Sequence, residues 1–473
     1  MKIKVPYNLL LLASISFLFF SCRIPNYIVK TNQQKLPETY KSQNSDTTNL
    51  VQIQWRQYFQ DKNLENLIDT ALKNNQELNI VLQEIEIARN EIRARKGEYL
   101  PFATLNGGIG VDKESHFSRM GIVEEEVSLK PNPFRDFNVG FNASWELDVW
   151  RKLRNAKDAA KAKYLATQEG KNFLITQLVA EIANSYYELL ALDNMLSIVE
   201  QNITIQQNAL AVIEQEKNSA RVSQLAVNRF QAQLLNTVNL QYQLKQQIVE
   251  TENRLHLLTG VYPRPILRTS TNFITISADS VVKAGVPAQL IRNRPDIRQA
   301  EYELIAAKLN IKSAKAAFYP SFRITAAVGT KGFSPELLFD PKALLFSLIG
   351  DAIAPLINRN AIKADYFIAH HKEAQVFYQY QQKVLNACLE VLNQLNAIDN
   401  YNKSLQTKSK EADILVQSIE IANELLKYAR ADYIEVLLTQ REALNTKMEL
   451  TEIKLKQLKA KVGLYQALGG GWQ

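Results

Sequence analysis

Two helical stretches without an internal proline dominate this chain and restrict the folds that it can adopt. They run from about residue 153 to 219 and from about 361 to 428, and apolar residues recur in them three and four positions apart. This spacing is typical of the seam between paired, coiled-coil-like helices. At 1.5 Å per residue each helix would be on the order of 100 Å long, which is too long for a compact domain. The sequence therefore predicts a tall wall of paired helices.

Each long stretch is followed by a turn and a returning helix of about half its length. Ser223 and Asp432 are residues of the type that starts helices, and the returning helices are expected over 224–258 and 433–468. Glu435 stands three residues after Asp432, which predicts a capping box between their side chains. The sequence therefore predicts two helical hairpins, with tips near 219–223 and 428–432.

The chain also repeats itself. Segments 74–101 and 293–320 match at several positions, and each is typical of a helix stopped by a proline and followed by an alternating strand. The expected fold class is mainly α, with an internal two-fold sequence repeat, long antiparallel hairpins and four β-strands per protomer. The further elements expected are half-length helices over 64–98 and 288–317 and strands over 101–112, 136–149, 320–330 and 344–356.

The stretch from 137 to 149 indicates what the strands face, because polar and apolar residues alternate strictly in it. Its length suits a tilted strand that crosses a membrane, and a bilayer tolerates no unpaired sheet edge. Four strands make too narrow a barrel, so three copies would form a trimeric, 12-stranded barrel. The loops 113–135 and 331–343 would then lie outside the cell. The residues expected to face lipid are Phe137, Val139, Phe141 and Trp145, and those expected to face the lumen are Asn138, Asn142, Glu146 and Asp148.

The N-terminus carries the features of a bacterial lipoprotein signal. Lys2 and Lys4 precede an apolar run that ends in Phe20-Ser21-Cys22 and is too short to span a membrane. Residues 1–21 are therefore predicted to be a signal peptide, with Cys22 as the lipidated first residue of the mature chain. The alternative is an ordinary signal peptide with an incidental cysteine.

The remaining sequence suggests a simple domain order. A lipidated N-terminus and polar tether occupy 22–50, the first repeat 51–262, an equatorial connector 263–286 and the second repeat 287–473. The net charge of +8 does not indicate nucleic-acid binding, because basic and acidic residues are interleaved along the chain. Cys388 lies in a helical stretch and is expected to be a small core residue, without a disulfide partner.

This pattern resembles the TolC-like outer-membrane factors, in particular the lipoprotein branch that serves efflux pumps of the resistance-nodulation-division type. The stretches that carry the resemblance are WRQYFQDKNLENLIDTAL (55–72), SWELDVWRKLRNA (144–156), VPAQLIRNRPDIRQAE (286–301), AAFYPSF (316–322), YARADYIEVLLTQREAL (428–444) and LYQALGGGW (464–472). The resemblance implies a homotrimer whose barrel lies in the outer membrane and continues as an α-helical tunnel in the periplasm. It implies export of small molecules (drugs, toxic compounds or metal ions), a periplasmic adaptor (membrane fusion) protein, an inner-membrane transporter reached through that adaptor, no cofactor and no catalysis.

The resemblance also assigns roles to the hairpin tips. In the family a small-Gly-apolar signature at each tip meets the adaptor, and acidic side chains just inside form the tunnel constriction. The matching tips here are Ser219, Ala220, Arg221, Val222, Ser223 and Tyr428, Ala429, Arg430, Ala431, Asp432. Both have Ala where the family usually has Gly, and Arg where it has an apolar residue. Glu435 matches a constriction acid, whereas Leu438 replaces the second one; Glu435 could equally serve only as a capping partner, and the two arginines only as solvated helix ends.

Three other functions remain open from the sequence. An enzyme has little support, since His370 and His371 point in different directions on a helix and no nucleophile elbow, phosphate loop or cysteine-metal spacing occurs. A lipid-anchored coiled-coil scaffold of the envelope would explain the helices but not the four strands. The outer-membrane channel of a type I protein secretion system would share the architecture, and the lipoprotein signal and GGGW end favour small-molecule efflux over it.

Overall fold

The computed structural model describes residues 24, 25, 27, 54–59, 61–126, 133–268, 273–276, 287–428 and 432–472. The predicted signal peptide, Cys22 and the tip residues Ala429, Arg430 and Ala431 lie outside these described residues. The described chain divides into two compact units. What we call the sheet unit contains 1–32, 85–166 and 300–379, and what we call the hairpin unit contains 33–84, 167–299 and 380–473, in so far as these ranges are described.

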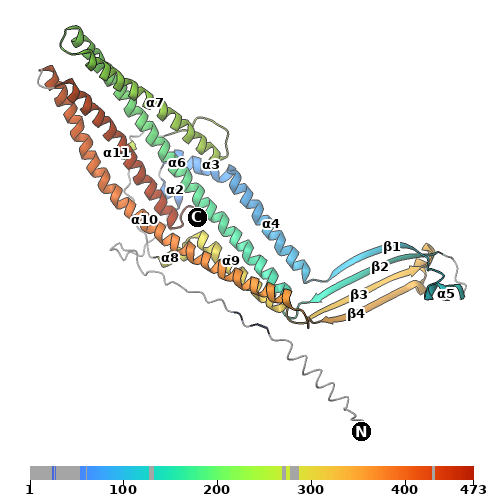
Figure 1. Cartoon of the computed structure of the whole chain (residues 1–473). Coiled ribbons are helices and arrows are strands. Elements are labelled where there is room, and N and C mark those ends of the chain that lie inside the picture. The colour runs from blue at the N-terminus through green and yellow to red at the C-terminus, as the bar shows by residue number, and fades with distance from the viewer. Residues whose placement is uncertain are drawn as a thin grey trace. The chain divides into compact units, whose positions relative to one another are not determined.

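The chain is mainly helical with one small sheet, as the sequence predicts (Figure 1). The two longest helices, α6 and α10, contain 67 and 68 residues and are followed by the returning helices α7 and α11. The α-helices are α2 (Trp55–Tyr58), α3 (Lys62–Asn74), α4 (Gln76–Glu98), α5 (Arg119–Glu126), α6 (Lys152–Asn218), α7 (Gln224–Thr259), α8 (Ala288–Asn293), α9 (Pro295–Ala316), α10 (Asn360–Lys427) and α11 (Tyr433–Ala467). The 3-10 helices are η2 (Phe273–Thr275), η3 (Pro335–Phe339) and η4 (Pro341–Ala343).

Two helices that the sequence suggests to be continuous are each broken once. Asn75 separates α3 from α4, where its side chain accepts a hydrogen bond from the Leu78 N–H (2.8 Å) and donates one to the Leu258 carbonyl (2.9 Å). Arg294 separates α8 from α9 with extended backbone angles, φ −83° and ψ 118°. The following Pro295 explains this break, because a proline ring disfavours the helical conformation of the residue before it.

The core of the hairpin unit forms where α6 meets the shorter helices. Ile182, Tyr186 and Leu189 of α6 are fully buried, and they belong to one cluster with Leu64 of α3 and Leu255 of α7. A hydrogen bond from the Asn194 amide to the Thr451 hydroxyl (3.0 Å) links α6 to α11. Cys388 lies buried in a second cluster, on α10, which is the core position expected for it.

The sheet contains four antiparallel strands in the order β1–β2–β3–β4, so β1 and β4 form its edges (Figure 1). The strands are β1 (Phe102–Asp112), β2 (Phe134–Leu147), β3 (Ser321–Gly332) and β4 (Leu344–Ile353). Each edge leads directly into a helix, because α4 precedes β1 and α10 follows β4. The sheet therefore occupies one end of the sheet unit, next to the ends of these helices.

Candidate functional site

The register of the sheet separates its two faces by polarity. Residues that are paired across neighbouring strands lie on the same face, and Phe141 pairs with Leu105 of β1 and Val328 of β3, which itself pairs with Phe346 of β4. The face that contains Phe141 also carries Ile109, Val139, Trp145, Ile324 and Leu348. Phe141 is 59% exposed and Phe346 82% exposed. This face of the sheet is thus largely apolar, and much of it is exposed in the single chain.

The opposite face is polar on three of the four strands. Asn142 of β2 pairs with Thr104 of β1 and Ala327 of β3, and Glu146 pairs with Arg323. Lys331 of β3 forms an ion pair with Asp136 of β2 at 2.9 Å. The edge strand β4 departs from this division, since Leu345, Ile349 and Ile353 place apolar side chains on the otherwise polar face.

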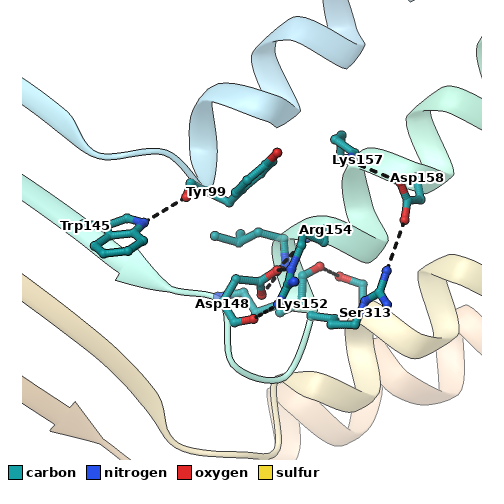
Figure 2. A network of polar contacts seen from close by, with 10 residues as sticks. Tyr99, Trp145, Asp148, Lys152, Arg154, Lys157, Asp158 and Ser313 are labelled. Atoms are coloured by element: carbon teal, nitrogen blue, oxygen red, sulfur yellow. Dashed lines mark hydrogen bonds and ion pairs between the residues drawn. The ribbon is translucent and has the colours of Figure 1, made fainter.

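Asp148 does not belong to the polar face of the strand, so this part of the sequence prediction is wrong. Strand β2 ends at Leu147, and the Asp148 carboxylate accepts hydrogen bonds from the backbone N–H groups of Leu153 (3.0 Å) and Arg154 (2.8 Å). These groups belong to the first turn of α6, where backbone donors have no partner within the helix. The Arg154 guanidinium also donates to the carboxylate at 3.1 Å (Figure 2). Asp148 is therefore a helix cap.

The charge of Asp148 is stabilised by these contacts. Burial by itself would raise the pKa of the carboxyl, but the hydrogen bonds from Arg154 and Leu153 and the charge of Arg154 outweigh it and hold the pKa below its ordinary value. The positive end of the α6 dipole acts in the same direction. Glu146, which remains on the strand, forms an ion pair with Lys152 at 2.9 Å. The available signal for this cap was Asp148 itself, because an Asp ahead of a helical stretch is typical of a helix start.

Aromatic side chains surround the same end of the sheet. The Trp145 indole N–H donates to the carbonyl of Tyr99 at 3.0 Å (Figure 2), and the Trp150 indole N–H donates to the carbonyl of Pro320 at 2.8 Å. Trp150 also stacks on Tyr319, with ring centroids 4.7 Å apart. Tryptophan and tyrosine, which combine an apolar ring with a polar group, are enriched where a membrane meets water. The sequence predicts that Trp145 faces lipid, but it gives no sign of this cluster.

The first hairpin tip has a defined backbone conformation. The N–H of Arg221 bonds to the carbonyl of Glu216, and the N–H of Ala220 bonds to the carbonyl of Lys217, both at 2.9 Å. This pair of bonds is a Schellman motif, in which the residue after the helix cap adopts left-handed angles and is usually glycine. Ala220 occupies that position with φ 59°. Ser223 begins the next helix without a side-chain cap bond.

At the second tip the predicted capping box is absent, which corrects the sequence interpretation. Asp432 precedes α11, but its side chain makes no capping hydrogen bond. Instead, the Glu435 N–H bonds to the backbone carbonyl of Asp432 at 3.0 Å. The Glu435 side chain is exposed, as is Tyr428 at the end of α10. Glu435 is therefore not engaged as a capping partner.

A groove of about 360 Å³ lies between α7 and α11 near the tips. Ile434, Leu437 and Leu438 of α11 line the groove. Arg229 of α7 and Arg441 of α11 line it as well. Both arginines are exposed, and neither forms an ion pair with any other residue in the described ranges. The sequence gives no sign of this pair, because the two residues come close only through the packing of α7 against α11.

Other kinds of site find little support in the described residues. Nowhere in these ranges do three or more His, Cys, Asp or Glu side chains gather closely enough to hold a metal ion. None of the described helices combines the length and the hydropathy needed to cross a bilayer. His370 and His371 lie among aromatic rings, and Cys388 is buried.

Comparison with known proteins identifies the family. The model of the family described as "Outer membrane efflux protein" matches residues 67–261 and 286–470, which is most of the chain. The chain belongs to the outer membrane efflux protein family. It is 30% identical to the solvent efflux pump outer membrane protein SrpC of Pseudomonas putida over 88% of this chain and 87% of SrpC. It is 28% identical to the cation efflux system protein CusC of Escherichia coli O6:H1 over 89% of this chain and 88% of CusC.

Solved structures agree with this assignment. A crystal structure of CusC superimposes with a TM-score of 0.82 and 26% identity, covering 94% of this chain and 99% of that one. As a member of the outer membrane efflux protein family, the chain is an outer-membrane protein and the outer-membrane channel component of a tripartite efflux system.

Proposed function

We propose that three copies of the chain form one conduit, in which their sheets close a 12-stranded barrel in the outer membrane. The observation that carries this proposal is the sheet itself: one apolar face, one largely polar face and two edges without a partner strand in the described chain. A bilayer requires every backbone N–H and C=O group to be paired, so β4 of one copy has to meet β1 of the next. The apolar face then contacts lipid and the polar face lines water, with Asn138, Asn142 and Glu146 toward the lumen.

The same closure brings two helices of neighbouring copies together. Since β1 is preceded by α4 and β4 is followed by α10, joining these edges places α4 of one copy beside α10 of the next. Ile87 lies eleven residues before the end of α4 at Glu98, and Ile368 lies eight residues after the start of α10 at Asn360. At 1.5 Å per residue they lie about 16 and 12 Å along their helices from the helix ends nearest the sheet, and these lengths differ by less than one turn. Ile87 is 66% and Ile368 50% exposed, so both side chains are available for this contact.

The other predicted residues are proposed to act on the periplasmic side of the barrel. Trp145, Trp150 and Tyr319 mark the periplasmic boundary of the membrane, and an acylated Cys22 anchors the chain in the same leaflet. The hairpin tips dock a periplasmic adaptor protein, which connects the conduit to an inner-membrane transporter. At the tips, the apolar groove with Arg229 and Arg441 suits an adaptor segment that carries an apolar side chain beside acidic ones.

Glu435 is proposed as the acid of a constriction near the tips, because its exposed carboxylate is free of the capping contact that the sequence suggested. The cargo is proposed to be small molecules, since the names of the relatives refer to cations and to solvents. The two matched segments of the family model fall in the two halves that the sequence repeat defines, which favours an internal two-fold repeat.

The size and conductance of the purified protein test this proposal. Light scattering in mild detergent, corrected for bound detergent, should give the protein mass of three copies. The same preparation should open ion-conducting channels in planar lipid films, as a water-filled barrel requires. A stable monomer that conducts no ions would contradict the proposed assembly.

A further inference from the structure

Tyr27, close to the N-terminus of the mature chain, packs into a small aromatic site on α10. Its ring lies 4.9 Å from Phe367, 5.3 Å from His371 and 5.7 Å from His370, measured between ring centroids. Its hydroxyl also forms a 2.8 Å hydrogen bond with Nε2 of His371. Three rings and one hydrogen bond from consecutive turns of one helix thus hold a single side chain. We call Phe367, His370 and His371 the Tyr27 site.

Ring contacts connect the Tyr27 site, through Tyr366 of α10, to Phe318 just before strand β3. His370 packs edge-on against Tyr366 at 4.6 Å, and Tyr366 packs edge-on against Phe318 at 5.7 Å. Phe318 precedes Ser321, where β3 begins, and Arg359, next to the start of α10, lies over the Phe318 ring at 5.1 Å. All of these rings belong to the sheet unit. Their contacts put the Tyr27 site near the end of the sheet where Trp150 and Tyr319 lie.

His370 contributes to the site as a neutral ring. Burial, the largest cause, lowers the pKa of His370, and the nearby His371 acts in the same direction, while Glu373 opposes them. Its Nε2 atom is buried and has no hydrogen-bond partner among the described residues. A ring in this state offers Tyr27 an apolar, aromatic surface, which suits edge-on packing.

Chain length connects this site to the predicted lipid anchor. Tyr27 lies five positions after Cys22 in the sequence, and an extended chain covers at most about 3.6 Å per residue. The Cα atom of Cys22 therefore lies within about 18 Å of the Cα atom of Tyr27, whatever path the chain takes. An acyl group on Cys22 can then enter the membrane only beside this end of the sheet.

We propose that the Tyr27 site is a docking site for the segment that follows the lipidated cysteine, and that it fixes the acyl anchor next to the membrane boundary of the sheet. The inference rests on the proposed lipidation of Cys22 and adds a residue-level reason for the position of the anchor. Tyr27 and the three side chains act as positioning residues.

Photo-crosslinking in the full-length protein tests the docking. p-Benzoylphenylalanine in place of Tyr27 should link to the tryptic peptide 364–372, which contains all three residues of the Tyr27 site. The same amino acid at Phe117, which is 97% exposed, is the matched control and should not label that peptide. Substituting Phe367→Ala and His371→Ala together should remove most of the product from position 27. Crosslinks from position 27 that scatter over other peptides, or that match the Phe117 control, would overturn the proposal.

Two further measurements on the same preparations separate this inference from the function on which it rests. Palmitate labelling that depends on Cys22 would support the lipid anchor. Protein that crosslinks but takes up no palmitate would refute the proposed anchoring role of the Tyr27 site. The mass of three copies shows that the conduit forms. Three-copy protein without a crosslink to peptide 364–372 would refute the docking alone, whereas monomeric protein with the crosslink would refute the proposed assembly alone.

Discussion

At the scale of single residues, Asp148 stabilises the start of α6 through its charge. Replacing it by Asn keeps the size of the side chain but removes the ion pair with Arg154 and weakens two hydrogen bonds to helix N–H groups. Loss of such charge-assisted bonds costs about 1–3 kcal/mol of unfolding free energy. Asp148→Asn should therefore lower the melting temperature in detergent. Asp399→Asn is the control, because its pair with Lys403 is exposed and is worth only about 0.3–0.5 kcal/mol.

The lowered pKa of Asp148 also predicts how the stability of the folded protein changes in acid. The pKa of Asp148 is lowered in the folded protein, so its contribution is fully present above about pH 3.9, the ordinary value for an unfolded chain. It is lost as the pH falls through the lower folded value, where the carboxylate becomes protonated. The difference in melting temperature between wild type and Asp148→Asn should thus be constant above about pH 3.9 and shrink as the pH falls below it. A difference that stays constant below this pH as well would show that the charge is not the source of the stabilisation.

Ala220 leads to a prediction of the opposite sign. Its left-handed backbone costs an L-residue about 1–2 kcal/mol, a cost that glycine does not have. Ala220→Gly should therefore slow amide hydrogen exchange at the end of α6 by raising the free energy of local opening by about 1 kcal/mol. Ala211→Gly, at an exposed position inside the same helix, should accelerate exchange by a similar energy. Faster exchange in both variants would contradict the Schellman geometry.

These residues also show where sequence reasoning fails. Asp148 continues the alternation of β2 perfectly, so periodicity alone assigned it to the strand. Its carboxylate instead turns to the free N–H groups of α6, because an unpaired helix start costs more than one missing strand position. Asp432 and Glu435 fit the capping-box pattern, yet no side-chain bond forms. Local patterns cannot decide such cases, since the outcome depends on which backbone donors are left without partners.

At the scale of elements, the sequence predicted the long helices and the strands better than it predicted the contacts of single residues. Proline-free, periodic stretches predicted α6 and α10 to within a few residues, and alternation predicted all four strands. The breaks at Asn75 and Arg294 were missed, although Pro295 was a visible signal for the second. The end of β4 was placed a few residues too late, because its apolar residues occupy both faces and blur the period. Strong periodicity therefore predicted which helices and strands form. It did not predict where they end, because the ends depend on contacts with residues distant in the sequence.

The orientation of the strands gives a prediction at this scale. Phe141 and Asn142 are neighbours on β2 and lie on opposite faces of the sheet. Phe141→Arg should impair membrane assembly, because an arginine facing lipid near the membrane centre costs about 2–4 kcal/mol. Asn142→Arg should be tolerated, since a lumen-facing charge stays in water. The measurement is the fraction of protein recovered as folded, heat-modifiable oligomer in outer membranes, and equal losses in both variants would contradict the assigned faces.

At the scale of the whole molecule, a single chain leaves surfaces exposed that the proposed assembly would cover. It exposes an apolar sheet face and two strand edges, and it exposes aliphatic side chains on the two helices that continue from those edges. The sequence predicts partner copies from the number and length of the strands and from the rule that a bilayer tolerates no unpaired sheet edge. It gave no pair of contacting residues, because contacts between copies follow from strand order, which periodicity does not encode.

The strand order provides such a pair. If β4 of one copy joins β1 of the next, cysteines at Ile87 and Ile368 should react with one short bismaleimide across copies in a Cys388→Ala background. Because each copy carries both cysteines, the products on a denaturing gel should reach three linked chains and no more. Cysteines at Phe117 and Ile368 are the control, since the first lies in the loop after β1 and should remain unlinked. Channel-active protein that yields no linked chains from the Ile87 and Ile368 pair would exclude the edge-to-edge order and require the copies to meet through another surface.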